Sequence, residues 1–162
     1  MLNKFFKRRR SLSIIAPMNG QLIPIEQVPD QVFSEKMMGN GIAIDPTDGN
    51  VFFPIDGEVI LIPETKHAIG LRAIGGTEIL IHIGLETVSL NGAGFHLLVE
   101  VGDQISVGQK LAEVQLDYIQ THATSAITPI VVTNDSRGEK TYSISDHREA
   151  IAGKTVILTI TG

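Results

Sequence analysis

The apolar stretch Ile79-Leu80-Ile81-His82-Ile83-Gly84-Leu85 lies near the middle of the 162-residue chain and contains a single imidazole. It is too short to span a membrane and is rich in β-branched residues, so it predicts a mostly buried β-strand. Burying the ring of His82 in this strand costs free energy unless both ring nitrogens have partners. A second histidine, His67, lies fifteen residues earlier. We expect His67 or a nearby carbonyl group to satisfy His82.

From residue 11 onward the chain is a succession of short β-type runs separated by Pro, Gly, Asn and Asp. No extended apolar run has the helical period, and pairs such as Asp56-Gly57 and Asn91-Gly92 suit tight turns. The expected strands lie at residues 21–25, 42–44, 58–62, 69–74, 78–83, 96–100, 111–114, 130–133 and 155–160. Only residues 115–122 predict a helical turn or two. The pattern therefore predicts an all-β fold.

Two segments of the chain recur within it. Residues 16–23, Ala-Pro-Met-Asn-Gly-Gln-Leu-Ile, match residues 53–60, Phe-Pro-Ile-Asp-Gly-Glu-Val-Ile, and residues 105–111 match residues 150–156 more loosely. Chance similarity between β-turns is one explanation. Otherwise the repeats indicate a barrel or sandwich built from two related halves.

The composition predicts one compact domain, because 162 residues with 43% apolar side chains suffice for a sizeable core. The absence of cysteine excludes disulfides, thiolate metal sites and thiol chemistry. No apolar segment is long enough for a signal peptide or a membrane span, so we expect a cytoplasmic protein. We divide the chain into a basic flexible arm, residues 1–10, and a single domain, residues 11–162.

Charge is distributed unevenly between these two parts. The arm carries five basic and no acidic side chains, which leaves eight basic against eighteen acidic side chains in the rest. An acidic body does not suit phosphate backbones, so we expect no nucleic-acid partner. The arm also has three large apolar residues and either rests weakly on anionic lipid or remains solvated.

His82 has the chemistry of a phosphoryl carrier. Neutral imidazole is nucleophilic near pH 7 and accepts a phosphoryl group to give a phosphoramidate. Such a carrier presents one ring nitrogen outward, and the carbonyl of Gly84 can approach closely to hold the other as N–H. His67 could donate a hydrogen bond to a transferring phosphoryl group, and the hydroxyl of Thr65 could position His67. The structural alternatives are a satisfied core histidine and an ordinary turn hydroxyl.

A zinc site is the competing functional hypothesis. His67, His82 and Glu86 could supply two imidazoles and one carboxylate, but their spacing matches no zinc signature. The chain also lacks the glycine-rich motifs that hold ATP or a dinucleotide. We therefore predict no metal and no cofactor, and we expect the phosphate to come from another protein. His96, His122 and His147 are expected to be surface residues without a role.

Residues 76–88, Gly-Thr-Glu-Ile-Leu-Ile-His-Ile-Gly-Leu-Glu-Thr-Val, resemble the active-site signature of the glucose-type enzyme IIA of the bacterial phosphotransferase system. The resemblance extends over nearly the whole chain. It includes Ile15-Ala16-Pro17, Val28-Pro29-Asp30, residues 32–36, residues 39–44, Thr65-Lys66-His67-Ala68, residues 91–95 and Thr128-Pro129-Ile130. It implies an antiparallel β-sandwich or barrel of the duplicated hybrid-motif type.

The resemblance also implies the roles of individual residues. The phosphocarrier protein HPr would pass its phosphoryl group to Nε2 of His82, which would pass it to a cysteine of a sugar-specific IIB or IIBC permease component. His67 would support the phosphorylated state, Thr65 would orient His67, and the Gly84 carbonyl would fix the tautomer of His82. Since the chain has no cysteine and no membrane segment, the IIB and IIC functions are expected on other polypeptides.

The resemblance further implies a shallow apolar docking surface around the two histidines. The matching positions are Val32, Phe33, Met38, Leu80 and Val88, together with Glu86, where some relatives carry Asp. Exposed apolar residues ringed by charge suit a transient interface, although some of these positions could simply be core. A regulatory binding module that signals through its phosphorylation state is the second functional alternative, beside the zinc hydrolase. The transported sugar does not follow from the sequence.

Overall fold

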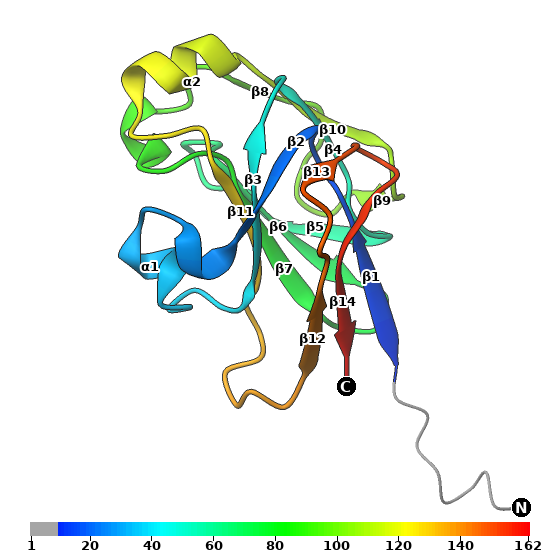
Figure 1. Cartoon of the computed structure of the whole chain (residues 1–162). Helices are drawn as coiled ribbons and strands as arrows, with labels where there is room; N and C mark the ends of the chain where they lie inside the picture. The colour runs from blue at the N-terminus through cyan, green and yellow to red at the C-terminus, as the bar shows by residue number, and fades with distance from the viewer. Residues whose placement is uncertain (1–9) are drawn as a thin grey trace, which may run out of the picture.

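The computed structural model describes residues 10–162 of the chain, and its regular structure is mostly β-strand (Figure 1). The strands are β1 (Ser11–Ile15), β2 (Gly20–Pro24), β3 (Gly41–Pro46), β4 (Asn50–Phe52), β5 (Gly57–Leu61), β6 (Ala68–Ala73), β7 (Glu78–His82), β8 (Phe95–Leu97), β9 (Gln104–Ile105), β10 (Lys110–Val114), β11 (Thr128–Val132), β12 (Thr141–Ile144), β13 (Glu149–Ala150) and β14 (Val156–Thr161). The α-helices are α1 (Gln31–Ser34) and α2 (Leu116–His122), and 3-10 turns lie at η2 (Ile25–Gln27) and η3 (Thr87–Leu90). The prediction of an all-β fold with short helical turns is confirmed.

The strands form one large sheet and two small ones, and every strand pair is antiparallel. The large sheet has the order β13-β2-β3-β11-β7-β6-β5-β9, and the small sheets have the orders β1-β14-β12 and β4-β10-β8. Apolar side chains from all three sheets meet in one core, which includes Ile14, Val51, Ile81 and Leu158. Burying this apolar surface is the main favourable contribution to folding.

Strand β7 lies at the centre of the large sheet, between β6 and β11, and is buried on both faces. Successive side chains of a strand point to opposite faces. Ile79 and Ile81 therefore enter the main core, while Leu80 enters a smaller cluster that also contains Phe33 of α1. His82 follows Leu80 by two residues and lies on the same face, beside α1.

The sheet order shows that the fold is duplicated. The half-sheet β13-β2-β3-β11 has the same succession of pairings as β9-β5-β6-β7, and the two halves join where β11 pairs with β7. In equivalent positions, Gly20 pairs with Ala150 and Gly57 pairs with Ile105. The repeats at residues 16–23 and 53–60 are therefore structural equivalents, each a turn that leads into a strand.

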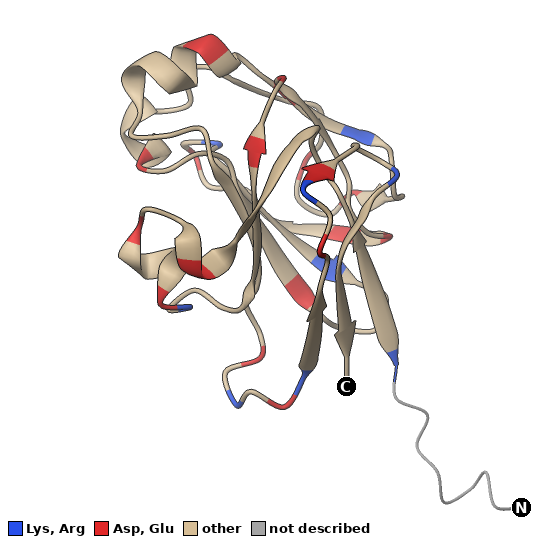
Figure 2. Ribbon diagram, viewed as in Figure 1, with Lys and Arg blue, Asp and Glu red and all other residues tan. Residues whose placement is uncertain are grey.

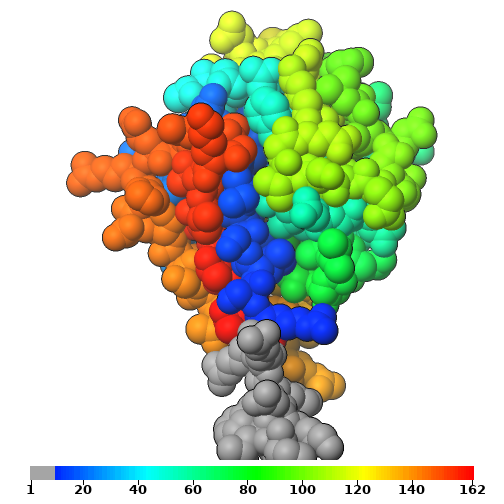
Figure 3. Space-filling view, turned by 90° about the vertical axis from the view of Figure 1, so that its right-hand side faces the viewer, coloured from blue at the N-terminus to red at the C-terminus, as the bar shows by residue number. Residues whose placement is uncertain are grey.

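The two copies of the repeat also interlock by equivalent hydrogen bonds. The N–H of Ile15 donates to the carbonyl of Pro54 at 3.0 Å, and the N–H of Phe52 donates to that of Pro17 at 2.8 Å. Figure 3 shows the consequence, with the blue N-terminal strand packed between the red C-terminal segment and the cyan and green middle of the chain. Each half of the molecule thus donates a backbone hydrogen bond to the turn of the other half.

The side chains of Asn19 and Asp56 play matching parts in this arrangement. The side-chain oxygen of Asn19 accepts from the N–H of Ala152 at 2.8 Å, and that of Asp56 accepts from the N–H of Val107 at 2.9 Å. The looser repeat, residues 105–111 and 150–156, supplies these two donors. Both repeats therefore take part in the same turn-to-turn contact, once in each half.

Every strand expected from the sequence overlaps an observed strand, and α2 covers most of residues 115–122. The elements that were not expected are β1, β4, β9, β12, β13 and α1, together with the two 3-10 turns. The basic arm predicted at residues 1–10 lies outside the described residues, except for Arg10.

Replacing Ile81 by alanine tests the central position of β7. The side chain of Ile81 is fully buried in the main core, so Ile81→Ala should lower the free energy of unfolding by about 2–5 kcal/mol. The matched control is Ile74→Ala, because Ile74 is 87% exposed and its truncation should change stability by less than about 0.5 kcal/mol. Urea unfolding at equilibrium measures both, and equal effects would contradict the assignment.

Candidate functional site

The pairing of β6 with β7 brings the two predicted histidines together. Ala68 of β6 is opposite His82 of β7, and the N–H of Ile83 donates to the carbonyl of His67 at 2.7 Å. His67 immediately precedes β6, so its ring lies beside that of His82. The ring centroids are 4.9 Å apart and the ring planes make an angle of 76°. The pairing of these two strands thus brings together two histidines that are fifteen residues apart in the sequence.

The tautomer of His82 is determined by a backbone contact. Nδ1 of His82 lies 2.7 Å from the carbonyl oxygen of Gly84. Because a carbonyl oxygen only accepts hydrogen bonds, Nδ1 must be the donor. In the neutral ring the lone pair is then on Nε2, which is the nitrogen available to an electrophile.

Gly84 can offer its carbonyl to His82 because it has no side chain. Its φ angle is +77°, and a Cβ atom would lie 2.6 Å from Cγ2 of Thr87 and 2.9 Å from the carbonyl oxygen of Ser125. The buried Thr87 hydroxyl donates to the carbonyl of Ile83 at 2.7 Å. The N–H of Gly84 faces the hydroxyl of buried Thr128 at 3.4 Å. The turn after β7 is therefore held from several sides.

His67 is held by the other predicted residue, Thr65. The hydroxyl oxygen of Thr65 lies 2.6 Å from Nδ1 of His67, so both nitrogen positions of the ring are oriented relative to His82. A hydroxyl can donate or accept, and the contact therefore fits either neutral tautomer of His67. A turn before β6, closed by the N–H of Lys66 donating to the carbonyl of Pro63 at 2.9 Å, places Thr65.

Burial keeps both rings in their neutral form. Desolvation lowers the pKa of His82 below its ordinary value, and the hydrogen bond to Gly84 and the charge of Asp30 partly oppose this effect. The pKa of His67 is also lowered, by burial and by the neighbouring His82. Neutral imidazole is the nucleophilic form, so these shifts keep His82 reactive at neutral pH.

Asp30 is a residue of this site to which sequence reasoning gave no role. Its carboxylate caps α1 by accepting from the N–H of Val32 at 2.9 Å, and its charge acts on His82. The helix that it caps places Phe33 against His82, with ring centroids 5.0 Å apart. The signal in the sequence was an acidic residue one position before a four-residue helix, which is too short to show a period.

The six predicted docking positions differ in exposure. Val32 is 40%, Met38 39% and Val88 54% exposed. Phe33 and Leu80 are buried, with 3% and 7% of their surface exposed, so they belong to the smaller apolar cluster and not to the exposed surface.

Two more exposed residues are relevant here, and one of them, Glu86, is the sixth predicted docking position. Met37, next to Met38, is 69% exposed and was not among the predicted positions. Glu86 is exposed as well. Figure 2 shows acidic positions in the segments that flank α1, where Lys36 pairs with Glu26 at 3.1 Å.

The ligand set that the zinc hypothesis requires is not assembled. Glu86 has a left-handed backbone conformation, with φ +58°, and its carboxylate accepts a hydrogen bond from the hydroxyl of Thr124. Across residues 10–162, no group of three or more His, Cys, Asp or Glu side chains is placed to hold a metal ion. His96, His122 and His147 are exposed. No helix within the described part of the chain is long and apolar enough to cross a membrane.

Comparison with known proteins gives consistent matches. Residues 12–138 match the family described as the phosphoenolpyruvate-dependent sugar phosphotransferase system, EIIA 1. The chain is 43% identical over 165 residues to the PTS system glucose-specific EIIA component of Staphylococcus epidermidis, covering 99% of each protein. It is 53% identical over 145 residues to the glucose-specific EIICBA component of Staphylococcus carnosus, covering 90% of this chain and 21% of that protein. The solved glucose permease IIA from Mycoplasma capricolum superimposes with a TM-score of 0.85 at 35% identity, covering 93% of this chain and 96% of that one.

The pKa shifts predict the behaviour of both histidines in a titration. NMR titration of the ring protons should give midpoints below about 6.5 for His82 and His67, because burial favours their neutral forms. The unfolded chain then binds more protons as the pH falls, so the free energy of unfolding should decrease once the pH falls below about 6.5 and stop decreasing below the folded pKa values. A midpoint for His82 at or above 6.5 would contradict the dominance of burial.

Proposed function

Because the chain belongs to the EIIA 1 family of the phosphoenolpyruvate-dependent sugar phosphotransferase system, and is a phosphocarrier of that system, we propose that His82 is the residue that carries the phosphoryl group. The observation that supports this most directly is the contact between Nδ1 of His82 and the Gly84 carbonyl, which leaves Nε2 with the lone pair. A histidine arranged in this way can attack phosphorus without first losing a proton.

The proposed reaction consists of two successive phosphoryl transfers, first from a histidine nitrogen of HPr to His82 and then from His82 to a cysteine sulfur. The lone pair on Nε2 of His82 attacks the phosphorus of phospho-HPr, a new P–N bond forms, and the P–N bond to the donor histidine breaks with its electron pair returning to that ring. In the second step a cysteine thiolate of the IIB component attacks the phosphorus. The P–N bond to His82 then breaks, and Nε2 regains its lone pair. The proton on Nδ1 remains with the Gly84 contact throughout.

In this proposal His67 stabilises charge on the phosphoryl oxygens. If the Thr65 hydroxyl donates to Nδ1 of His67, then Nε2 of His67 carries a hydrogen that it can donate toward a group on His82. The two rings meet nearly edge to face, which suits such a contact. Phosphoryl transfer requires mainly positioning and charge stabilisation, and the fixed rings supply both.

We propose that phospho-HPr is the donor and that a sugar permease with IIB and IIC components is the acceptor. The EIICBA proteins of Staphylococcus carnosus and Staphylococcus saprophyticus, which this chain resembles over part of their length, support such an acceptor. The glucose-specific names of these relatives favour glucose as the transported sugar. A cytoplasmic location follows from this role, since the donor of the phosphoryl group is a cytoplasmic carrier.

The assigned roles are tested by phosphorylating the chain with phosphoenolpyruvate, enzyme I and HPr. Intact-protein mass should show one acid-labile phosphoryl group on the wild type and none on His82→Ala. The variant His67→Gln should accept the group but donate it to a IIB acceptor about 100-fold more slowly, because a charge-stabilising donor is lost. His147→Gln, at an exposed position, is the matched control and should behave as wild type.

Two other outcomes of this experiment would change the assignment. Full onward transfer by His67→Gln would refute the role of His67. Phosphorylation of His82 without any transfer to IIB would instead support the regulatory module.

The docking surface makes a separate prediction. Val88 is exposed in η3, the turn that follows His82 in the chain, so Val88→Asp should weaken transfer from HPr at least tenfold at subsaturating HPr, by placing a charge in the proposed apolar contact. Ile74→Asp introduces the same charge at an exposed residue in the turn between β6 and β7, at the opposite end of β7 from His82, and it should leave transfer unchanged. An equal loss of transfer rate in both variants would show that the added negative charge acts irrespective of its position, and not through docking.

A further inference from the structure

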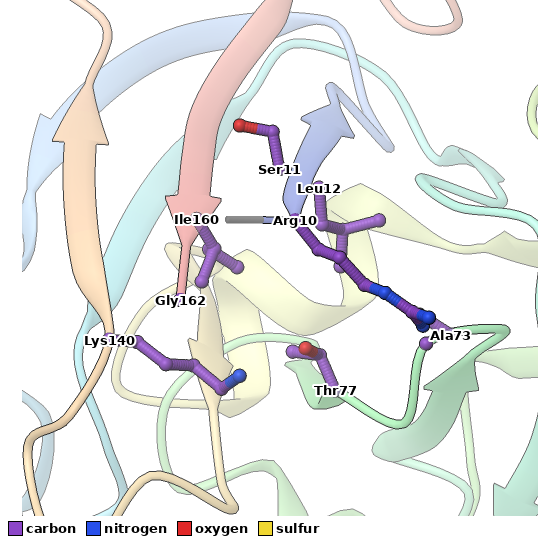
Figure 4. A pocket seen from close by; sticks show the side chains of 9 residues that line it. Arg10, Ser11, Leu12, Ala73, Thr77, Lys140, Ile160 and Gly162 are labelled. Atoms are coloured by element: carbon purple, nitrogen blue, oxygen red, sulfur yellow. The ribbon is translucent and has the colours of Figure 1, made fainter. Parts of the chain in front are cut away.

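A pocket lies far from the two histidines. It has a volume of about 310 Å³ and is bounded by the start of β1, the end of β14 and the turn between β6 and β7 (Figure 4). Thr77, which lines the pocket, immediately precedes β7, whereas His82 ends this strand. Five strand residues span roughly 17 Å, so the pocket and the histidines are separate sites.

Two cationic side chains from different parts of the chain line this pocket. Arg10 precedes β1 and Lys140 precedes β12, and Figure 4 shows their charged ends on either side of the Thr77 side chain. Neither forms an ion pair with another residue in the range 10–162. None of the described lining residues is Asp or Glu, although the carboxylate of Gly162, the last residue of the sequence, is nearby. The lining side chains are therefore two cations and no acid, while the Gly162 carboxylate and the carboxylate of Asp135, on which the charge of Lys140 acts, offset part of this positive charge.

Thr77 supplies a third polar group at the same place. The residue is buried, with 9% of its surface exposed, and its hydroxyl forms no hydrogen bond with another described residue. No fully buried side-chain nitrogen or oxygen in residues 10–162 lacks a partner, so the remaining accessible surface of Thr77 includes its hydroxyl. In Figure 4 this hydroxyl points into the pocket. A hydroxyl that is accessible from the pocket and has no hydrogen-bond partner among the described residues can donate to a ligand.

We propose that this pocket binds a small phosphomonoester, with Arg10 and Lys140 contacting the phosphate oxygens and the Thr77 hydroxyl donating to one of them. A phosphomonoester carries about two negative charges at neutral pH, so both cations attract it. Arginine in particular suits phosphate because its planar group donates two parallel hydrogen bonds. Leu12 and Ile160 form an apolar wall against which the organic part packs.

The test is a titration of the full chain, uniformly labelled with ¹⁵N, followed by amide NMR shifts at constant ionic strength. Glucose 6-phosphate and inorganic phosphate should produce saturable shifts at the amides of Gly75, Gly76 and Thr77, and glucose should produce none. Shifts at His67 and His82 are read separately, because they report the other site.

Three variants locate the ligand. Arg10→Gln and Lys140→Gln should each weaken binding about tenfold, the effect of losing one charged hydrogen bond. Thr77→Val keeps the shape of the side chain and should weaken binding about threefold, at the lower end for a neutral donor. Lys154→Gln removes the same charge at an exposed lysine outside the pocket and should bind as wild type.

Several outcomes would overturn the proposal. These are the absence of saturable shifts near Thr77, shifts confined to the histidines, or equal weakening by Lys154→Gln. Vesicles of phosphatidylglycerol distinguish the other source of phosphate, because shifts at Thr77 with vesicles but not with soluble phosphates would assign the site to a lipid headgroup. An unchanged amide spectrum of each variant without ligand shows that its fold is intact.

Discussion

The hydrogen bond from Nδ1 of His82 to the carbonyl of Gly84 is the contact on which the site depends. Neutral imidazole has one N–H, and this contact determines which nitrogen carries it. The carbonyl reaches the ring only because Gly84 has a left-handed backbone and no Cβ atom. A Cβ at this position would collide with Thr87 and Ser125. Burial of the ring adds the second condition, a lowered pKa that keeps the imidazole neutral. Orientation and protonation state are thus both properties of one strand end, and they exist before any partner binds.

The duplicated fold explains why this strand end is rigid. Strand β7 is at the seam where the two halves of the large sheet meet, so it has a hydrogen-bonded neighbour on each side. The halves are also connected by reciprocal contacts at their turns, in which Asn19 and Asp56 accept from backbone N–H groups in equivalent positions. A site at an outer strand would have one free edge and could shift with it. At the seam, moving His82 would require both halves to move.

Much of this arrangement could be predicted from the sequence, for physical reasons that differ between elements. The run around His82 is apolar and β-branched, and the repeats at residues 16–23 and 53–60 share their turn residues, so local pattern indicated both. Strands β9 and β13 have two residues each, too few for any alternation. The effect of the Asp30 charge on the pKa of His82 depends on their closeness in the folded chain, which their separation in the sequence does not reveal. The burial of Phe33 depends on how α1 packs on the sheet, so the sequence left open whether this position is core or surface.

The exposed residues that we expect to contact partners come from segments outside the central strands. Val32 belongs to α1, Met38 follows it, and Val88 belongs to η3, each a segment of a few residues. A carrier that exchanges partners must release each of them, which requires a small contact area and moderate affinity. Short segments laid over a rigid sheet meet this requirement, because their side chains can vary without altering the geometry of His82. Under the proposed function, donor and acceptor need the same nitrogen and therefore the same surface, so they bind in turn. The reactive nitrogen is the fixed element of the interface, and the residues around it determine which partners it meets.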